Sequence, residues 1–271
     1  MISNIRLKYF AVLRMNWVQA LEYRANTLVG LIAVISGLFI EYQIWDLIFE
    51  TQGISSIKGF TFNELMVFIF LSIIVGQLKS SWHTSGEMIE GIRTGDINKY
   101  LIRPVSYFWY HFMMFIGYNS LYYIAYFVLV TALVIVLPSS MLFPDFYHIV
   151  GFLLALSISI YLSYSIYYTM ICFAFWFGEV RSLVVAYNLA IIILSGQYIP
   201  IRLFPDNVLK ILDWTPFKFL VDFPVSIATG LLPMNELVPS LIHAMIWCIV
   251  LTLISSFIYR LGIRSYEAYG S

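Results

Sequence analysis

The most informative polar stretch of this sequence lies at residues 84–104, in a chain of which only 11% of the residues are charged. Thr84 and Glu87 have the spacing of a capping box, in which a hydroxyl and a carboxylate bind the free backbone N–H groups at the start of a helix. Gly95 is placed to end that helix. The spacing therefore predicts a short helix over Ser85–Thr94.

The predicted helix has one apolar face, formed by Met88, Ile89 and Ile92. Asp96 is placed to cap a second short helix that ends at Leu101. The charged residues in and after the first helix are Glu87, Glu90, Arg93, Asp96 and Arg103. The segment is therefore either a docking surface for another protein or a solvated loop that only fixes the geometry of its neighbours, and spacing alone favours neither.

Other reactive side chains form no recognisable catalytic or metal-binding set. The four histidines lie in separate segments, at His83, His111, His148 and His243. Cys172 and Cys248 fall inside apolar runs, as small buried thiols do. The phosphate-binding motif G-x-x-x-x-G-K-[ST] is absent from the sequence, so any ATP hydrolysis must come from a separate polypeptide.

Two classes of membrane protein can be tested against the sequence. An integral-membrane enzyme that modifies lipids needs a convergent nucleophile or acid–base set at one membrane face. A secondary transporter typically shows internal repeats and charges at the middle of the membrane. The sequence shows neither pattern convincingly, and each stays an alternative only.

The composition places these charges in a membrane protein. Hydrophobic residues make up 61% of the chain and charged residues 11%, and Asp145 is the one formal charge between Tyr107 and Phe177. A soluble domain carries about 25% charged residues, because its helices need a polar face. The net charge is zero, which gives no basis for a nucleic-acid partner.

We predict an all-α integral membrane protein with one domain over residues 1–271. About 20 apolar residues are needed to cross a bilayer. Six spans meet this need, at residues 25–45, 65–82, 107–137, 149–177, 183–201 and 237–259. With the N-terminus inside the cell, eleven Lys and Arg residues lie on the inner side and four on the outer side. This bias predicts a cell-membrane protein with both termini in the cytoplasm.

Two further segments are predicted to lie at the membrane surfaces. Residues 1–24 place Ile5, Tyr9, Val12, Leu13 and Trp17 at helical spacing, which indicates an interfacial helix in contact with lipid or, alternatively, a basic flank that orients the first span. Residues 199–236 contain five prolines, and the apolar stretches between them, at Val208–Leu212 and Phe219–Phe223, are too short to span. They predict external re-entrant or interfacial half-helices between the fifth and sixth spans.

The segment GDINKYLIRPVSYF, residues 95–108, resembles the stretch after the second span in permease subunits of ABC-2-type transporters. It is most similar to the compact six-span branch named "ABC-2 family transporter protein". Residues 196–201, the Phe204-Pro205 and Thr215–Phe217 pieces, and the ending Arg260–Ser271 also resemble that branch. The resemblance covers nearly the whole chain through the number and order of its spans.

This resemblance implies a division of labour between subunits. The loop after the second span would contain a coupling helix that rests in a groove of an ATP-binding subunit, and ATP and Mg would be bound there and not by this chain. A second permease protomer, identical or similar, and membrane lipids would complete the assembly. The residues implied in coupling are Glu87, Met88, Glu90, Ile92, Arg93, Asp96, Arg103, Glu179 and Arg181.

The same resemblance implies alternating access through a pathway between two protomers, lined by the second and fifth spans. The pathway residues would be Phe68, Ser72, Gln77, Asn188, Ile192, Ser195 and Gln197. This lining is largely apolar, which suggests export of a hydrophobic or amphipathic substrate.

Overall fold

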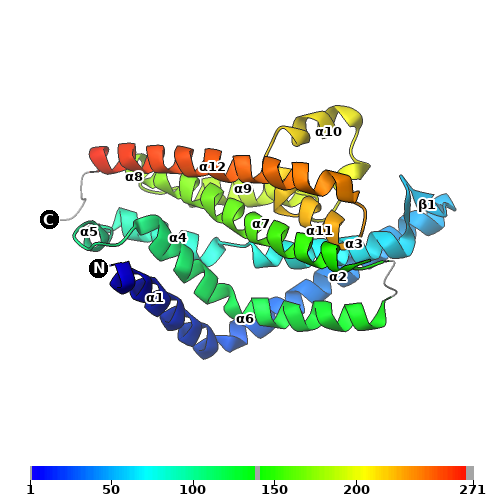
Figure 1. Ribbon diagram of the computed structural model, residues 1–271, viewed down its shortest axis with the longest axis horizontal. Coiled ribbons are helices and arrows are strands. Elements are labelled where there is room, and N and C mark those ends of the chain that lie inside the picture. The colour runs from blue at the N-terminus through cyan, green and yellow to red at the C-terminus, as the bar shows by residue number, and fades with distance from the viewer. Residues whose placement is uncertain (1, 138–140, 267–271) are drawn as a thin grey trace.

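A computed structural model describes residues 2–137 and 141–266, with the backbone alone at residues 2–6 and 82. The chain is almost entirely helical, and its long helices run along the longest axis of the molecule (Figure 1). Helix α1 (Ile2–Glu22) begins and α12 (Met234–Ser265) ends at the same end of the bundle, as an even number of crossings would require. The predicted all-α membrane fold is confirmed.

Five stretches of the described residues are long and apolar enough to cross a membrane. They are α2 (Arg24–Gln52), the stretch Phe62–Arg93, α6 (Tyr107–Val136), the stretch Phe146–Phe177, and α12. A break at residues 79–81 divides Phe62–Arg93 into the apolar helix α3 (Phe62–Leu78) and a short helix α4 (Trp82–Arg93). The second predicted span therefore ends four residues earlier than expected.

The predicted fifth span differs most from the structure. Its helical part, α9 (Arg181–Leu194), has 14 residues, which gives a length of about 21 Å. A bilayer core is about 30 Å thick, so α9 alone is shorter than a full crossing. Turns and the 3-10 helix η1 (Ile201–Leu203) follow it. The count of six spans thus stays a prediction.

Helix α3 is the central helix of the bundle. It belongs to the stretch Phe62–Arg93, whose most apolar part is 71% buried, against 44% or less for the other four span-length stretches. Leu65, Leu71 and Val75 are fully enclosed by side chains of the neighbouring helices. Thr61 caps its start, because the Thr61 side chain accepts from the Glu64 N–H and the Glu64 carboxylate accepts from the Thr61 N–H.

The predicted capping box at Thr84 and Glu87 is wrong. Helix α4 already begins at Trp82, and its N-cap Ser81 makes no side-chain cap hydrogen bond. Thr84 is buried within the helix, and Glu87 instead accepts a hydrogen bond from Tyr118. The spacing of Thr84 and Glu87 matches the capping-box pattern, but α4 begins at Trp82, about one turn before the predicted start at Ser85.

The rest of the charged segment folds nearly as predicted. Helix α4 ends at Arg93, and Gly95 follows with φ +87°, a conformation that favours glycine. The second short helix, α5 (Asn98–Leu101), starts from Ile97 without a side-chain cap, because Asp96 pairs with Lys99 instead of capping.

The N-terminal helix α1 is present, but its predicted apolar face contacts protein. Tyr9, Val12, Leu13 and Trp17 are partly buried on the side that packs against α6, and the described part of Ile5 is its backbone alone. The Tyr9 hydroxyl accepts a hydrogen bond from the Ser106 N–H at 2.9 Å. Other apolar side chains point away from the bundle and are available to lipid: Leu7, Phe10, Met15 and Val18.

Short helices occupy the predicted outer segment. These are η1, α10 (Asp206–Asp213), η2 (Phe217–Leu220) and α11 (Asp222–Ala228). Helix α10 lies at the edge of the bundle (Figure 1), whereas η2 and α11 pack against α7 (Phe146–Cys172). A small hairpin of β1 (Ser56–Ile57) and β2 (Phe60–Thr61) lies at the same end. Which side of the membrane this end faces stays a prediction.

The close contact of α1 with α6 depends on Gly117. A Cβ there would lie 2.9 Å from the Leu13 carbonyl oxygen and 2.7 Å from the Asn16 Cβ. Gly117→Ala should therefore force α1 away and lower the free energy of unfolding by about 1–3 kcal/mol. A thermal unfolding scan in detergent measures this as a lower melting temperature.

Gly37→Ala is the matched control, because a Cβ at Gly37 in α2 meets nothing within 4 Å. Alanine favours helix over glycine, so this control should keep or slightly raise the melting temperature. Equal melting temperatures for the Gly117 variant and the wild type would show that α1 is not held at this contact.

Candidate functional site

Helix α4 is fixed to the rest of the protein by its apolar face. Met88, Ile89 and Ile92 each expose only 1% of their surface. They pack in one cluster with side chains of α6, α7 and α8 (Ala174–Phe177), including Phe115 and Phe175. Met88 and Ile92 were among the residues that the resemblance implied in coupling, and that role stays a prediction. Their side chains are buried in the chain's own core, so they anchor α4 and are not available to a partner.

The exposed side of α4 carries an ion-pair network. Arg93 Nη2 donates to both carboxylate oxygens of Glu90, at 2.7 and 2.9 Å. Arg181, from the start of α9, donates to Glu90 Oε2 at 3.2 Å and lies 3.8 Å from Glu179 Oε1. The structure thus brings together two predicted groups that are 91 residues apart in the sequence. We call Glu90, Arg93, Glu179 and Arg181 the α4 network.

The α4 network lies on the outside of the protein. Each of its four side chains keeps between 39% and 53% of its surface exposed. The hydrogen bond from Arg93 lowers the pKa of Glu90, so this carboxylate stays ionised at neutral pH. The arrangement presents two guanidinium groups and two carboxylates at fixed positions, which suits recognition of a charged protein surface.

The remaining predicted coupling residues lie apart from this network. Asp96 and Lys99 form an exposed pair at 3.0 Å beside α5. Arg103 is exposed between α5 and α6. Glu87 points to the other side of α4, where the Tyr118 hydroxyl donates to its Oε1 at 3.0 Å.

The end of α12 closes the C-terminal end of α4. The Tyr266 hydroxyl donates to the Ile92 carbonyl oxygen at 2.8 Å and so satisfies one of the free carbonyls at a helix end. Gly262 lets α12 approach the Phe175 ring, since a Cβ there would lie 2.2 Å from it. The sequence singled out Arg260–Ser271, but residues 267–271 lie outside the described part, and nothing in the pattern indicated that Tyr266 reaches α4.

The predicted pathway residues do not gather on one surface. Phe68 and Ser72 on α3 are buried in the protomer core, as are Ser195 and Gln197 after α9. The Gln197 amide packs against Gly76, where a Cβ would lie 2.3 Å from it. Burial within one protomer leaves these four side chains without an open surface in this structure. Their role in a pathway stays a proposal.

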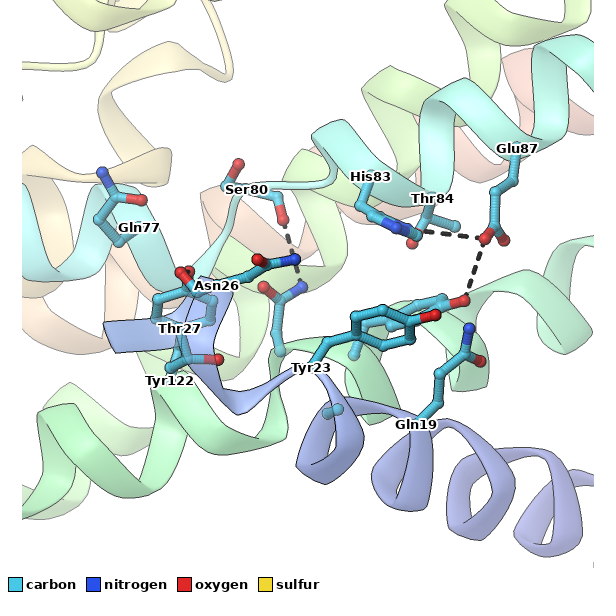
Figure 2. A pocket seen from close by; sticks show the side chains of 13 residues that line it. Gln19, Tyr23, Asn26, Thr27, Gln77, Ser80, His83, Thr84, Glu87 and Tyr122 are labelled. Carbon is cyan, nitrogen blue, oxygen red and sulfur yellow. Dashed lines mark hydrogen bonds and ion pairs between the residues drawn. The ribbon is translucent and has the colours of Figure 1, made fainter. Parts of the chain in front are cut away.

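Three pathway residues are more accessible. Asn188 accepts a hydrogen bond from the Tyr167 hydroxyl and donates to the Val184 carbonyl at 2.8 Å, and Ile192 is half-buried on α9. Gln77 lines a polar cavity of about 410 Å³ between α1, α2, α3, α4 and α6 (Figure 2). The sequence reasoning missed this cavity, because its walls come from three separate segments.

The comparisons with known proteins decide the family. The family model described as "ABC-2 family transporter protein" matches residues 24–270. The chain belongs to the ABC-2 transporter family. No curated protein matches the chain. With its span-length apolar helices, the chain is thus a multi-pass membrane protein of a transporter family, as its sequence motifs predicted. The match begins at residue 24, so it covers α2 onward and leaves α1 outside.

In this ABC-2 protein the carboxylate of Asp222 links two of the short helices, η1 and α11, a contact that the sequence did not indicate. Asp222 Oδ1 accepts from the Ile201 N–H at 3.1 Å, and Oδ2 accepts from the Ser226 hydroxyl at 3.4 Å. Part of the residue stays accessible, but burial around its carboxylate raises the pKa of Asp222 to about 6. A polar residue within an apolar, proline-rich stretch was the one signal that could have found it.

Protonation of Asp222 should make stability depend on pH. Its pKa is 3.8 without burial and about 6 in the fold, so the folded state binds the proton more tightly. Its contribution to stability is full below pH about 4, is lost as the pH rises through about 6, and stays lost above that. Asp222→Asn keeps the shape without the charge. The variant should melt at a higher temperature than wild type at pH 7.5 and lack the fall in melting temperature that wild type shows between pH 4 and 7.

Asp213→Asn serves as the control, because Asp213 is an exposed acid of the same outer segment, paired with Lys218 at 2.7 Å. This control should keep the wild-type change in melting temperature. If Asp222→Asn instead showed the same pH profile as wild type, the buried carboxylate would not be what links stability to pH.

Proposed function

We propose that this chain is the membrane-spanning permease subunit of an ATP-driven exporter, with α4 as the coupling helix that docks on a separate ATP-binding subunit. The observation that carries the proposal is the construction of α4: an apolar face buried in the membrane subunit and, on its free side, the exposed α4 network. Family membership supports it, since the chain matches the ABC-2 family over residues 24–270.

The packing gives α4 a mechanical role in this proposal. The cluster around Met88 and Ile92 joins α4 to α6, α7 and α8, so a push on α4 moves these helices with it. The break at residues 79–81 separates α4 from the central helix α3. Closure of the ATP-binding subunits, which bind ATP and Mg, would therefore shift the cytoplasmic ends of α6 and α7 relative to α3. Such a shift opens and closes a pathway in turn, as alternating access requires.

A second permease protomer completes the proposed transporter. Helix α9 exposes large apolar side chains such as Leu189 and Ile193, and its short length leaves it poorly suited to lie alone in lipid. A second copy packed along α9 would cover this surface. The pathway would then run between the protomers, near Asn188 and Ile192, and its apolar surroundings favour a hydrophobic or amphipathic substrate.

Exchanging the charges of the α4 network tests the docking surface. The triple variant Glu90→Arg, Arg93→Glu and Arg181→Glu keeps opposite charges in both ion pairs of residue 90, gives up the weaker contact of residue 181 with Glu179, and reverses the pattern shown to a partner. Exposed substitutions cost about 0.5 kcal/mol or less, so the variant should reach the membrane in normal amounts. Like charges brought together at an interface cost several kcal/mol, so co-purification with the ATP-binding subunit should fall at least tenfold, by about 1.4 kcal/mol or more.

The exchange Asp213→Lys with Lys218→Asp is the matched control, because it reverses an exposed ion pair at the opposite end of the bundle. It should leave co-purification unchanged. Normal co-purification and normal transport by the triple variant would show that α4 does not dock on the ATP-binding subunit.

Single cysteines test the proposed orientation. Ser55 lies in the loop before β1 and Lys99 in α5, and both are exposed. The native Cys172 and Cys248 are buried, so they give a low background. With the cytoplasmic side at α5, an impermeant thiol reagent should label Ser55→Cys in intact cells and Lys99→Cys only after lysis. Labelling of Lys99→Cys in intact cells would reverse the orientation.

A further inference from the structure

The polar cavity beside α4 has the composition of a binding site. About 410 Å³ in volume, it lies where the kink between α1 and α2, the break between α3 and α4, and the middle of α6 meet. Its walls carry hydroxyl and amide groups from all three segments, and Figure 2 shows these side chains around one shared space. A cavity with convergent polar groups in an otherwise apolar bundle calls for a polar occupant.

One carboxylate sets the charge of this cavity. Glu87 lines it, and neither Lys nor Arg is among the lining residues. The other acids of α4 and α5 are neutralised by close basic partners, since Glu90 pairs with Arg93 and Asp96 with Lys99. Within residues 7–137 and 141–266, the one basic partner of the Glu87 carboxylate is the His83 ring, whose Nδ1 lies 3.7 Å from Glu87 Oε1. Glu87 is therefore the group that gives the cavity its negative charge.

The aromatic residues of the cavity suit an organic cation. Tyr23 comes from the kink and Tyr118 and Tyr122 from α6, so three ring systems line the space around Glu87. The Tyr118 hydroxyl donates to Glu87 and thereby holds the carboxylate in place. An ammonium group within about 6 Å of an aromatic ring is attracted by its π-face, and a nearby carboxylate adds a charge-assisted contact.

A second cavity gives this site a route of access. It has a volume of about 460 Å³, lies between α4, α5 and α6, and shares Glu87 with the first. The Glu87 side chain is 42% exposed, so a ligand can reach it from this side.

We propose that the cavity around Glu87 binds the ammonium group of an amphipathic amine. The carboxylate of Glu87 and the rings of Tyr23 and Tyr118 contact the cation. The amide of Gln77, on another wall of the cavity, faces the rest of the ligand. The ammonium group could belong to a soluble amine or to a lipid headgroup, since both present the same chemistry. The site is complete within one chain, so binding requires neither ATP nor the ATP-binding subunit.

The test uses the full-length chain in nanodiscs made of phosphatidylglycerol, whose headgroup has no ammonium. Radiolabelled benzyltrimethylammonium is the probe, and empty discs give the background. Wild type should bind the probe saturably and should not bind benzenesulfonate, an anion of similar size. Glu87→Gln keeps the acceptor for Tyr118 but removes the charge, so affinity should fall about fivefold or more, as for a half-exposed ion pair of about 1 kcal/mol.

Two variants make the result specific. Glu22→Gln removes an exposed carboxylate from the nearby end of α1 that does not line the cavity, and it should bind as wild type does. Tyr23→Leu keeps an apolar side chain without the π-face and should also weaken binding. If Glu87→Gln fails to elute as a single species, the affinity of Tyr23→Leu for the probe tests the proposed site instead. Absence of saturable probe binding to wild type would overturn the proposal. So would a wild-type affinity for the probe in the correctly folded Glu87→Gln and Tyr23→Leu variants.

A second nanodisc composition identifies the source of the ammonium group. Discs that also contain phosphatidylcholine present a trimethylammonium headgroup in the membrane. Weaker probe binding in these discs would assign the site to a lipid headgroup, and unchanged binding would assign it to a soluble amine. Normal co-purification of the α4-network triple variant with the ATP-binding subunit, together with saturable probe binding by the wild type, would reject the proposed coupling role of α4 and leave this site standing.

Discussion

The burial of the apolar face of α4 is the contact on which the rest of this end of the bundle depends. Met88, Ile89 and Ile92 are enclosed by α6, α7 and α8, and removal of one such side chain from water contributes about 1.5–3 kcal/mol. This burial fixes which side of α4 stays outside, and thus where Glu90 and Arg93 point. Exposed ion pairs contribute about 0–1 kcal/mol each, so the α4 network is a consequence of this packing and not its cause.

Two different surfaces of α4 follow from that one constraint. The face that carries Glu90 and Arg93 meets Arg181 and stays open to a partner, whereas the face that carries Glu87 turns toward α6 and the polar cavity. A protein bound on the first face and a ligand bound on the second would act on the same short helix. Because the break at residues 79–81 precedes α4, such coupling does not need to pass through the buried α3.

The sequence predicted those features that depend on composition and local pattern. Long apolar runs identified the membrane helices, and prolines among apolar residues identified the short outer helices such as α11. The capping box at Thr84 failed, since the three-residue spacing recurs by chance and the helix begins earlier, at Trp82. Contacts between distant segments were beyond the sequence. The apolar face of α4 indicated that Ile92 packs against something but not against which helices, and the pairing of Glu90 with Arg181 leaves no local signal.

The most direct test of this account is an experimental structure of the chain in complex with its ATP-binding subunit. The account predicts that the exposed side of α4 lies in a groove of that subunit, with Arg93 and Arg181 within hydrogen-bonding distance of its acidic side chains. Met88 and Ile92 should remain buried in the membrane subunit. A complex in which the ATP-binding subunit contacts other parts of the chain and leaves the α4 network in solvent would contradict the account.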